Sequence, residues 1–240
     1  MIFRLLQRIM DRTAICLYLG AIGLLILTNT ETPSAVTLLG GFSAATTMRM
    51  LNIVGIIRWI LAVLPPVAVS VLFISMELGT QSTFTMLRSK SVVRWTMCRI
   101  GVVFIANIVY PLMVCGIALL FSPYSWLEIL RVFATFTSHI CMVSYLSTFL
   151  IARFRSQKPA FFAFIMIEGC SVVVGSVVPS ISKYMIGFWG MAQHSIYLLN
   201  DRMIHFAITS CFTIVICMIS VVFTIGYLHR NNPAASPSNL

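Results

Sequence analysis

The stretch CRIGVVFIANIVYPLMVCGIALLF, residues 98–121, decides the structural class of this chain. It holds one charged side chain, Arg99, in 24 residues. A helix that crosses the hydrocarbon core of a bilayer needs about 20 predominantly apolar residues. The strands of a membrane barrel alternate apolar and polar residues, and this stretch does not. It therefore predicts a transmembrane helix.

Five further apolar runs flank this stretch, at 14–28, 56–76, 127–151, 160–179 and 204–228. Of the 240 residues, 59% are apolar and only 9% are charged, with a mean hydropathy of +0.98, whereas a soluble domain carries about 25% charged residues. We expect an all-α polytopic membrane protein with six transmembrane helices. An ordinary soluble enzyme, a disordered chain and a secreted disulfide scaffold are excluded. The seven cysteines lie mostly in apolar runs, which favours reduced, buried thiols.

The basic residues predict the orientation of the spans. The net charge is +10, but the basic residues form short clusters between the apolar runs, so we expect topology determinants and no nucleic-acid partner. With the N-terminus in the cytoplasm, 11 of the 16 Lys and Arg residues fall on the inside. The five that remain outside are Arg49, Arg58, Arg131, Lys183 and Arg202. Six spans then place both termini in the cytoplasm, and residues 229–240 predict a disordered polar tail.

Three segments refine this single domain, residues 1–228. In residues 1–13, polar side chains recur every three or four positions, which predicts an amphipathic helix in the lipid headgroup plane. The alternative of a cleaved signal peptide is disfavoured by Asp11 and by the lack of a small-residue cleavage site. Pro65 and Pro66 should kink or break the second span. Residues 180–203 predict an outer re-entrant hairpin rather than a seventh span, because Lys183, Gln193 and His194 interrupt them.

Polar residues inside the spans mark faces that meet protein or water. Glu168 is the one acidic residue well inside a span, and we expect it to face protein. An ion pair with Arg153, Arg155 or Lys158 is one alternative for it. His139 is a candidate proton-relay group, although a packing histidine is more common. The candidate pathway-lining residues, for which ordinary helix packing is the alternative role, are Thr135, Ser138, His139, Tyr145, Glu168, Ser171, Thr213 and Ser220.

Several catalytic motifs are missing from the sequence. It has no GxxxxGK[ST] phosphate loop, no GxSxG nucleophile elbow and no HExxH zinc motif. No Cys/His spacing predicts a zinc site. We therefore expect no catalytic residue, no metal site and no cofactor on this chain.

The segment Glu77–Arg99, ELGTQSTFTMLRSKSVVRWTMCR, joins the second and third spans on the cytoplasmic side. Its apolar residues and its basic residues Arg88, Lys90, Arg94 and Arg99 suit either lipid headgroups or an acidic partner. By itself, such a loop is equally well explained as a topology anchor.

This segment resembles the corresponding loop of the type-2 exporter class of ABC-transporter permeases. The matching residues are Glu77, Gly79, Thr80, Leu87, Ser89, Ser91, Arg94 and Arg99. The family is also similar in its six spans, its N-terminal interfacial helix and its outer hairpin before the last span. The proline common near the serine-rich part of the loop is missing here.

The resemblance implies a bacterial permease subunit, of the peptide- or drug-export or bacteriocin-immunity type. Residues 77–97 would form a coupling loop that docks on a separate ABC ATPase, with ATP and Mg bound by that partner. The coupling residues would be Glu77, Gly79, Thr80, Leu87, Arg88, Lys90, Ser91 and Arg94. The other partners would be membrane lipids and a second permease copy. The competing hypotheses are a proton-coupled carrier that uses Glu168 or His139, and a non-transporting immunity or scaffold protein.

Overall fold

The computed structural model describes residues 2–28, 35–39, 41, 53–79, 91–121, 126–178, 181, 184–191 and 202–231. All regular secondary structure within these ranges is helical. The elements are α1 (Ile2–Ile9), α2 (Arg12–Leu27), α3 (Ala35–Leu39), α4 (Ile53–Leu78), α6 (Val92–Phe121), α7 (Trp126–Phe154), α8 (Lys158–Phe164), the π-helix η1 (Ile165–Cys170), α9 (Ser171–Val177), α11 (Ile186–Trp189) and α13 (Arg202–Arg230).

Five helices in the described ranges are long and apolar enough to cross a membrane. They are α4, α6, α7, the continuous segment Lys158–Val177, and the Ser210–Arg230 part of α13. The helices α1 and α2, bent by 51° at a short break, supply a sixth span if they are counted as one. The expectation of an all-α, multi-pass membrane protein is confirmed.

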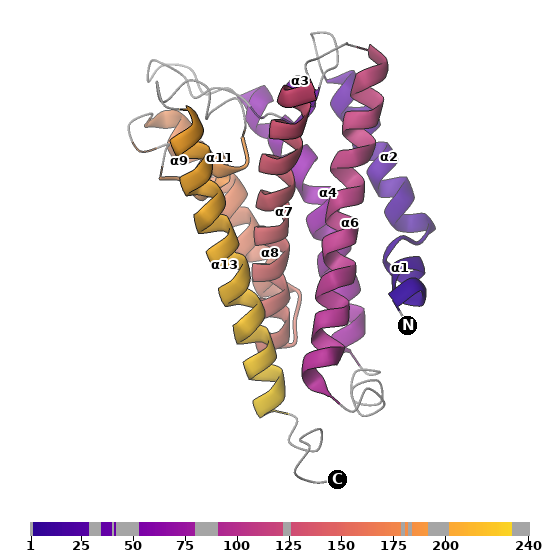
Figure 1. Cartoon of the computed structure of the whole chain (residues 1–240). Coiled ribbons are helices and arrows are strands. Elements are labelled where there is room, and N and C mark those ends of the chain that lie inside the picture. Colours follow the sequence, from indigo (N-terminus) through magenta and orange to yellow (C-terminus); the bar gives the residue numbers. More distant parts are fainter. Residues whose placement is uncertain are drawn as a thin grey trace.

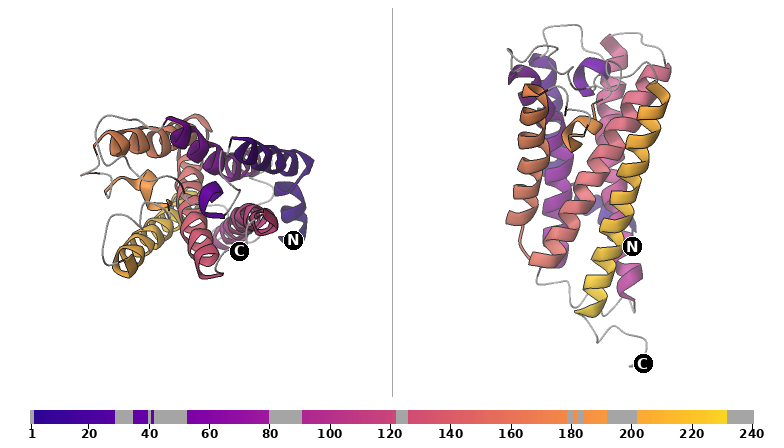
Figure 2. Two further views of the ribbon diagram at one scale, coloured as in Figure 1. Left: turned by 90° about the horizontal axis from the view of Figure 1, so that it is seen from above. Right: turned by 90° about the vertical axis from the view of Figure 1, so that its left-hand side faces the viewer.

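Helix α7 lies in the middle of the bundle and contacts α13, α4, α6, α8 and α3 (Figure 1). Viewed from above, α1 and α2 lie at one edge, whereas α8, α9 and α13 lie on the other side of α7 (Figure 2). The end of α4, the start of α6 and the end of α13 point toward the same end of the bundle (Figure 1). We call this the terminal end, and the opposite one the distal end.

The paired prolines do not break the second span. Helix α4 continues from Ile53 to Leu78 with Pro65 and Pro66 both inside it and both buried. A proline removes one backbone donor, but neighbouring helices in a membrane bundle can support the freed backbone groups. Here α4 packs against α7, α2 and α6. Tertiary packing therefore keeps the helix continuous where local propensity predicts an interruption.

The N-terminal segment forms the expected amphipathic helix. In α1, Leu5 and Ile9 are buried, whereas Arg4 and Arg8 are exposed. Helix α2 begins at Arg12, and the Asp11 carboxylate caps it by accepting a 2.8 Å hydrogen bond from the Ala14 N–H. At the other end of the chain, α13 continues to Arg230 and so includes the first two residues of the expected tail.

Candidate functional site: two buried charge clusters

Glu168 lies at the centre of a buried polar cluster formed by three helices. Its side chain has no exposed surface, so the prediction that it faces protein is confirmed. Its Oε2 accepts a 2.7 Å hydrogen bond from Trp59 Nε1 in α4, and its Oε1 lies 2.6 Å from His139 Nε2 in α7. The alternative of an ion pair with Arg153, Arg155 or Lys158 is wrong. We call Trp59, His139 and Glu168 the distal cluster.

The distal cluster has one unsatisfied polar atom. A distance of 2.6 Å between Oε1 and Nε2 requires a proton between them, held by the imidazole if Glu168 is ionised or by the carboxyl group if it is not. His139 Nδ1 is buried and has no hydrogen-bond partner among the residues that the structure describes. Because His139 is only 1% exposed, that nitrogen is shielded from solvent as well. The contact between His139 and Glu168 is therefore enclosed by protein on the side of that nitrogen too.

Glu168 lies in a stretch of π-helix rather than α-helix. Residues Ile165–Cys170 form a π-helix between α8 and α9. Such π-bulges rotate the side chains that follow them and often occur at functional sites. Glu168 belongs to this π-helix, and its Oε2 contacts Trp59, 109 residues away in the sequence.

A short segment, residues 184–191, inserts into the bundle beside the distal cluster. Phe188 and Met191 in this segment are 2% and 0% exposed. A Cβ atom added at Gly190 would lie 2.5 Å from His139 Cγ, and one at Gly175 would lie 2.6 Å from Phe188 Cε2. Glycine is therefore the residue that lets this inserted segment approach the helices so closely.

The inserted segment bears on the expected hairpin at 180–203. Helix α11 has four residues, too few to span a membrane, and it contacts α9 and η1. The Gly187 N–H donates to Ser171 Oγ over 3.1 Å. Residues 184–191 thus pack against the helices of the bundle, and residues 202–203 already belong to α13. Residues 180, 182–183 and 192–201 lie outside the described ranges, so the re-entrant hairpin stays a prediction.

A second set of buried polar groups surrounds Asn107 in α6. Asn107 Oδ1 accepts hydrogen bonds from Ser70 Oγ in α4 at 3.2 Å and from Ser144 Oγ in α7 at 3.5 Å. Its amide nitrogen lies 3.9 Å from the Cys141 sulfur. These residues satisfy one another, so they are best explained as a polar contact that joins α4, α6 and α7.

The terminal end of the bundle contains an ion cluster centred on Glu77. Glu77 Oε2 lies 2.8 Å from Arg99 Nη2 and 3.0 Å from Arg99 Nε, and Oε1 lies 2.8 Å from Arg8 Nη1. The Arg99 side chain is 5% exposed and stacks on Trp95, with its guanidinium carbon 3.8 Å from the ring centroid. This terminal cluster joins α1, α4 and α6 at the two ends of the 80–90 segment.

The rest of the predicted coupling loop is only partly described. Gly79 follows the last residue of α4. Ser91 precedes α6, and its Oγ accepts a 3.3 Å hydrogen bond from the Arg94 N–H, which is an N-cap contact. Arg94 itself is exposed. Thr80, Leu87, Arg88 and Lys90 lie outside the described residues.

The predicted pathway-lining residues divide into buried and half-buried groups. Of those outside the distal cluster, the buried ones are Thr135, Thr213 and Ser220, and the half-buried ones are Ser138, Tyr145 and Ser171. The hydroxyls of Thr135 and Ser138 donate to carbonyls of their own helix. Of this set, His139 and Glu168 lie in direct side-chain contact in the distal cluster.

Two important residues carry weak or missing sequence signals. Asn107 is an amide inside an apolar span, so the rule that intramembrane polar residues are functional or packed could have found it. Trp59 could not have been found, because an indole in a span resembles any other large apolar residue until its N–H partner is known. In the described ranges, no group of three or more His, Cys, Asp or Glu side chains could hold a metal ion.

Comparison with known protein families, with curated proteins and with solved structures finds no match for this chain.

Proposed function

We propose that this protein is the membrane subunit of an ATP-driven exporter of the ABC type. It would carry an amphipathic substrate such as a peptide, a drug or a lipid-like molecule across a bacterial cell membrane, with both termini in the cytoplasm. Nucleotide and Mg would bind to a separate ATPase, and a second permease copy would complete the pathway. The proposal comes from the resemblance of the segment Glu77–Arg99 to the corresponding loop of type-2 exporter permeases.

The observation that most supports the proposal is the terminal cluster. Glu77 lies in the last turn of α4 and Arg99 lies in the second turn of α6. Their side chains are joined by a buried ion pair. A push on residues 80–90 would therefore reach α4 and α6 as a unit rather than bend each helix separately. Arg8 extends the same connection to α1. A lever that transmits force from a partner needs this kind of rigid base.

Helix α7 offers a second route for such a movement. In the turn that links α7 to α8, Arg155 Nη1 donates to the Leu78 carbonyl over 3.3 Å, and Gln157 Nε2 donates to Ser75 Oγ over 2.8 Å. Both acceptors belong to the last turn of α4. Displacement of the end of α4 would thus move the central helix of the bundle as well.

The proposal is tested by reconstituting the chain with the ATPase encoded nearest to it and measuring ATP hydrolysis and transport together. We expect Arg94→Glu to reduce transport several-fold per ATP hydrolysed, because Arg94 is exposed beside the 80–90 segment. Arg4→Glu is the matched control, since Arg4 is an exposed arginine of α1. Transport by the purified chain without any ATPase, or equal effects of the two substitutions, would contradict the proposal.

The distal cluster supports a second candidate function, a proton-coupled carrier. Proton relays in membrane proteins are commonly built from buried carboxyl and imidazole groups. Uptake of substrate into liposomes that follows an imposed pH gradient without nucleotide, and that is lost in Glu168→Gln, would favour the carrier over the exporter.

A further inference from the structure

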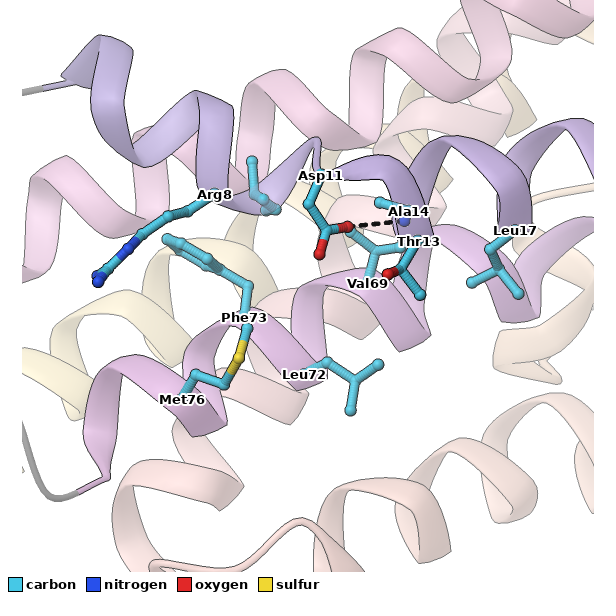
Figure 3. A pocket seen from close by; sticks show the side chains of 10 residues that line it. Arg8, Asp11, Thr13, Ala14, Leu17, Val69, Leu72, Phe73 and Met76 are labelled. Carbon is cyan, nitrogen blue, oxygen red and sulfur yellow. Dashed lines mark hydrogen bonds between the residues drawn. The ribbon is translucent and has the colours of Figure 1, made fainter.

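The bend between α1 and α2 leaves a cavity of about 200 Å³ against the side of α4 (Figure 3). Helix α1 turns away by 51°, and on the α4 side the cavity is lined by Val69 and Phe73, which are buried, and by Leu72 and Met76. On that face Leu72 and Met76 are 45% and 63% exposed. The volume is below the roughly 300–1,000 Å³ of a pocket for a whole drug-sized molecule, which suits part of an extended ligand.

The lining of the cavity is mostly apolar, with its polar residues confined to the α1–α2 side. Arg8, Asp11 and Thr13 supply the polar lining, and Leu17, Leu72, Phe73 and Met76 belong to the apolar lining (Figure 3). The polar residues belong to the terminal side of the bundle, where the amphipathic α1 lies. A phospholipid in the leaflet on that side likewise carries its polar headgroup at the surface and its apolar acyl chains toward the membrane centre.

The charges at the polar end are of both signs. The Arg8 side chain is 58% exposed and already shares Glu77 through Nη1. Asp11 uses Oδ1 to accept the Ala14 N–H. A purely anionic headgroup would be attracted by Arg8 but repelled by Asp11. A headgroup with a phosphate and an ammonium group complements both residues.

We propose that this cavity is a binding site for an aminophospholipid of the surrounding membrane. The phosphate lies at Arg8, the primary ammonium group donates hydrogen bonds to the Asp11 carboxylate, and one acyl chain fills the space between Leu17 and Leu72. This proposal does not depend on the exporter function. In this proposal, the lipid bound at the bend between α1 and α2 helps to hold α2 against α4.

Acyl chains contact every lipid-facing groove, so headgroup selectivity is the property that tests the site. The full chain, purified in detergent, is titrated with phosphatidylethanolamine, phosphatidylcholine or phosphatidylglycerol of identical acyl chains, and native mass spectrometry measures the first binding event. An exposed ionic contact is worth about 0.2–1 kcal/mol, which corresponds to about a 1.4- to fivefold preference. We expect phosphatidylethanolamine to bind more tightly than the other two lipids by about that factor.

Two variants separate the headgroup contact from the cavity. Asp11→Asn keeps the side-chain oxygen that caps α2 but removes the charge, so the preference for phosphatidylethanolamine over phosphatidylglycerol should vanish while the protein stays folded. Leu72→Trp fills the cavity and should weaken the first binding event of all three lipids.

Leu112→Trp, at a 53% exposed position on α6, is the control for a new indole in contact with lipid, and it should change nothing. Equal binding of the three lipids to the original chain would mean ordinary boundary lipid and would overturn the proposal. Tighter binding of phosphatidylglycerol, or an unchanged preference in Asp11→Asn, would overturn the headgroup assignment.

Discussion

Replacing Glu77 by alanine should destabilise the bundle far more than replacing Arg8, although both residues belong to the same ion cluster. Glu77→Ala leaves the guanidinium of Arg99 buried against the Trp95 ring, with a hydrogen bond from Nη1 to the Trp95 carbonyl over 3.2 Å. Arg8→Ala leaves Glu77 paired with Arg99, because Arg99 makes two contacts to Oε2.

The magnitudes follow from the exposure of the charge that loses its partner. Removing one member of a buried ion pair costs about 3–5 kcal/mol, because the remaining charge stays desolvated. Arg99 is 5% exposed, so Glu77→Ala should lower the free energy of unfolding by about 3 kcal/mol or more. Arg8 is 58% exposed, and exposed pairs contribute about 0–1 kcal/mol.

The measurement is equilibrium unfolding of the purified chain by SDS in mixed micelles, followed by far-UV circular dichroism. The double variant Glu77→Ala/Arg99→Leu should recover a large part of the loss, because it removes the unpaired charge as well. Equal losses in Glu77→Ala and Arg8→Ala, or no recovery in the double variant, would refute the assignment of the terminal cluster as a buried ion pair.

Three further substitutions have distinct expected outcomes. Glu168→Leu should lower the free energy of unfolding by about 1–3 kcal/mol for each of the two groups that it strands, whereas Glu168→Gln should lose less; unchanged expression and activity of Glu168→Leu would contradict a role for the distal cluster. Gly190→Ala should lower the melting temperature, because overpacking costs about 1–3 kcal/mol, while Gly101→Ala, with no heavy atom within 4 Å of the new Cβ, should leave it unchanged or raise it; equal shifts would contradict the close approach of the inserted segment. Ser91→Ala should lose about 0.5–2 kcal/mol of helix capping, and hydrogen exchange should accelerate in the first turn of α6 but not at its centre.

Glu168 illustrates how far intramembrane polarity could be interpreted from the sequence. An acidic side chain deep in a span has to be compensated, so its contact with protein was predictable. Its partners were not, because Trp59 and His139 are 109 and 29 residues away. Basic residues close in sequence were reasonable candidates, but the carboxylate contacts Trp59 of α4 and His139 of α7 instead.

Pro65 and Pro66 illustrate a second limit, because the local rule predicts a kink or a break and the helix does not break. Local propensity disfavours proline inside a helix, yet α4 is continuous. Stability inside a membrane bundle depends on contacts with neighbouring helices, and a single helix considered in isolation does not include them.

The sequence by itself determined the helical, multi-pass class of this protein and most span boundaries, because hydropathy over about 20 residues is a local property that the bilayer selects. It also determined the amphipathic character of α1. Only the tertiary structure decided that Glu77 pairs with Arg99 and Arg8, and that Glu168 contacts Trp59 and His139. The same holds for residues 184–191, which pack closely against α7 and α9 where Gly190 and Gly175 leave room. Those contacts depend on which helix faces meet, and packing shape and buried charge select the faces through interactions between residues far apart in the chain.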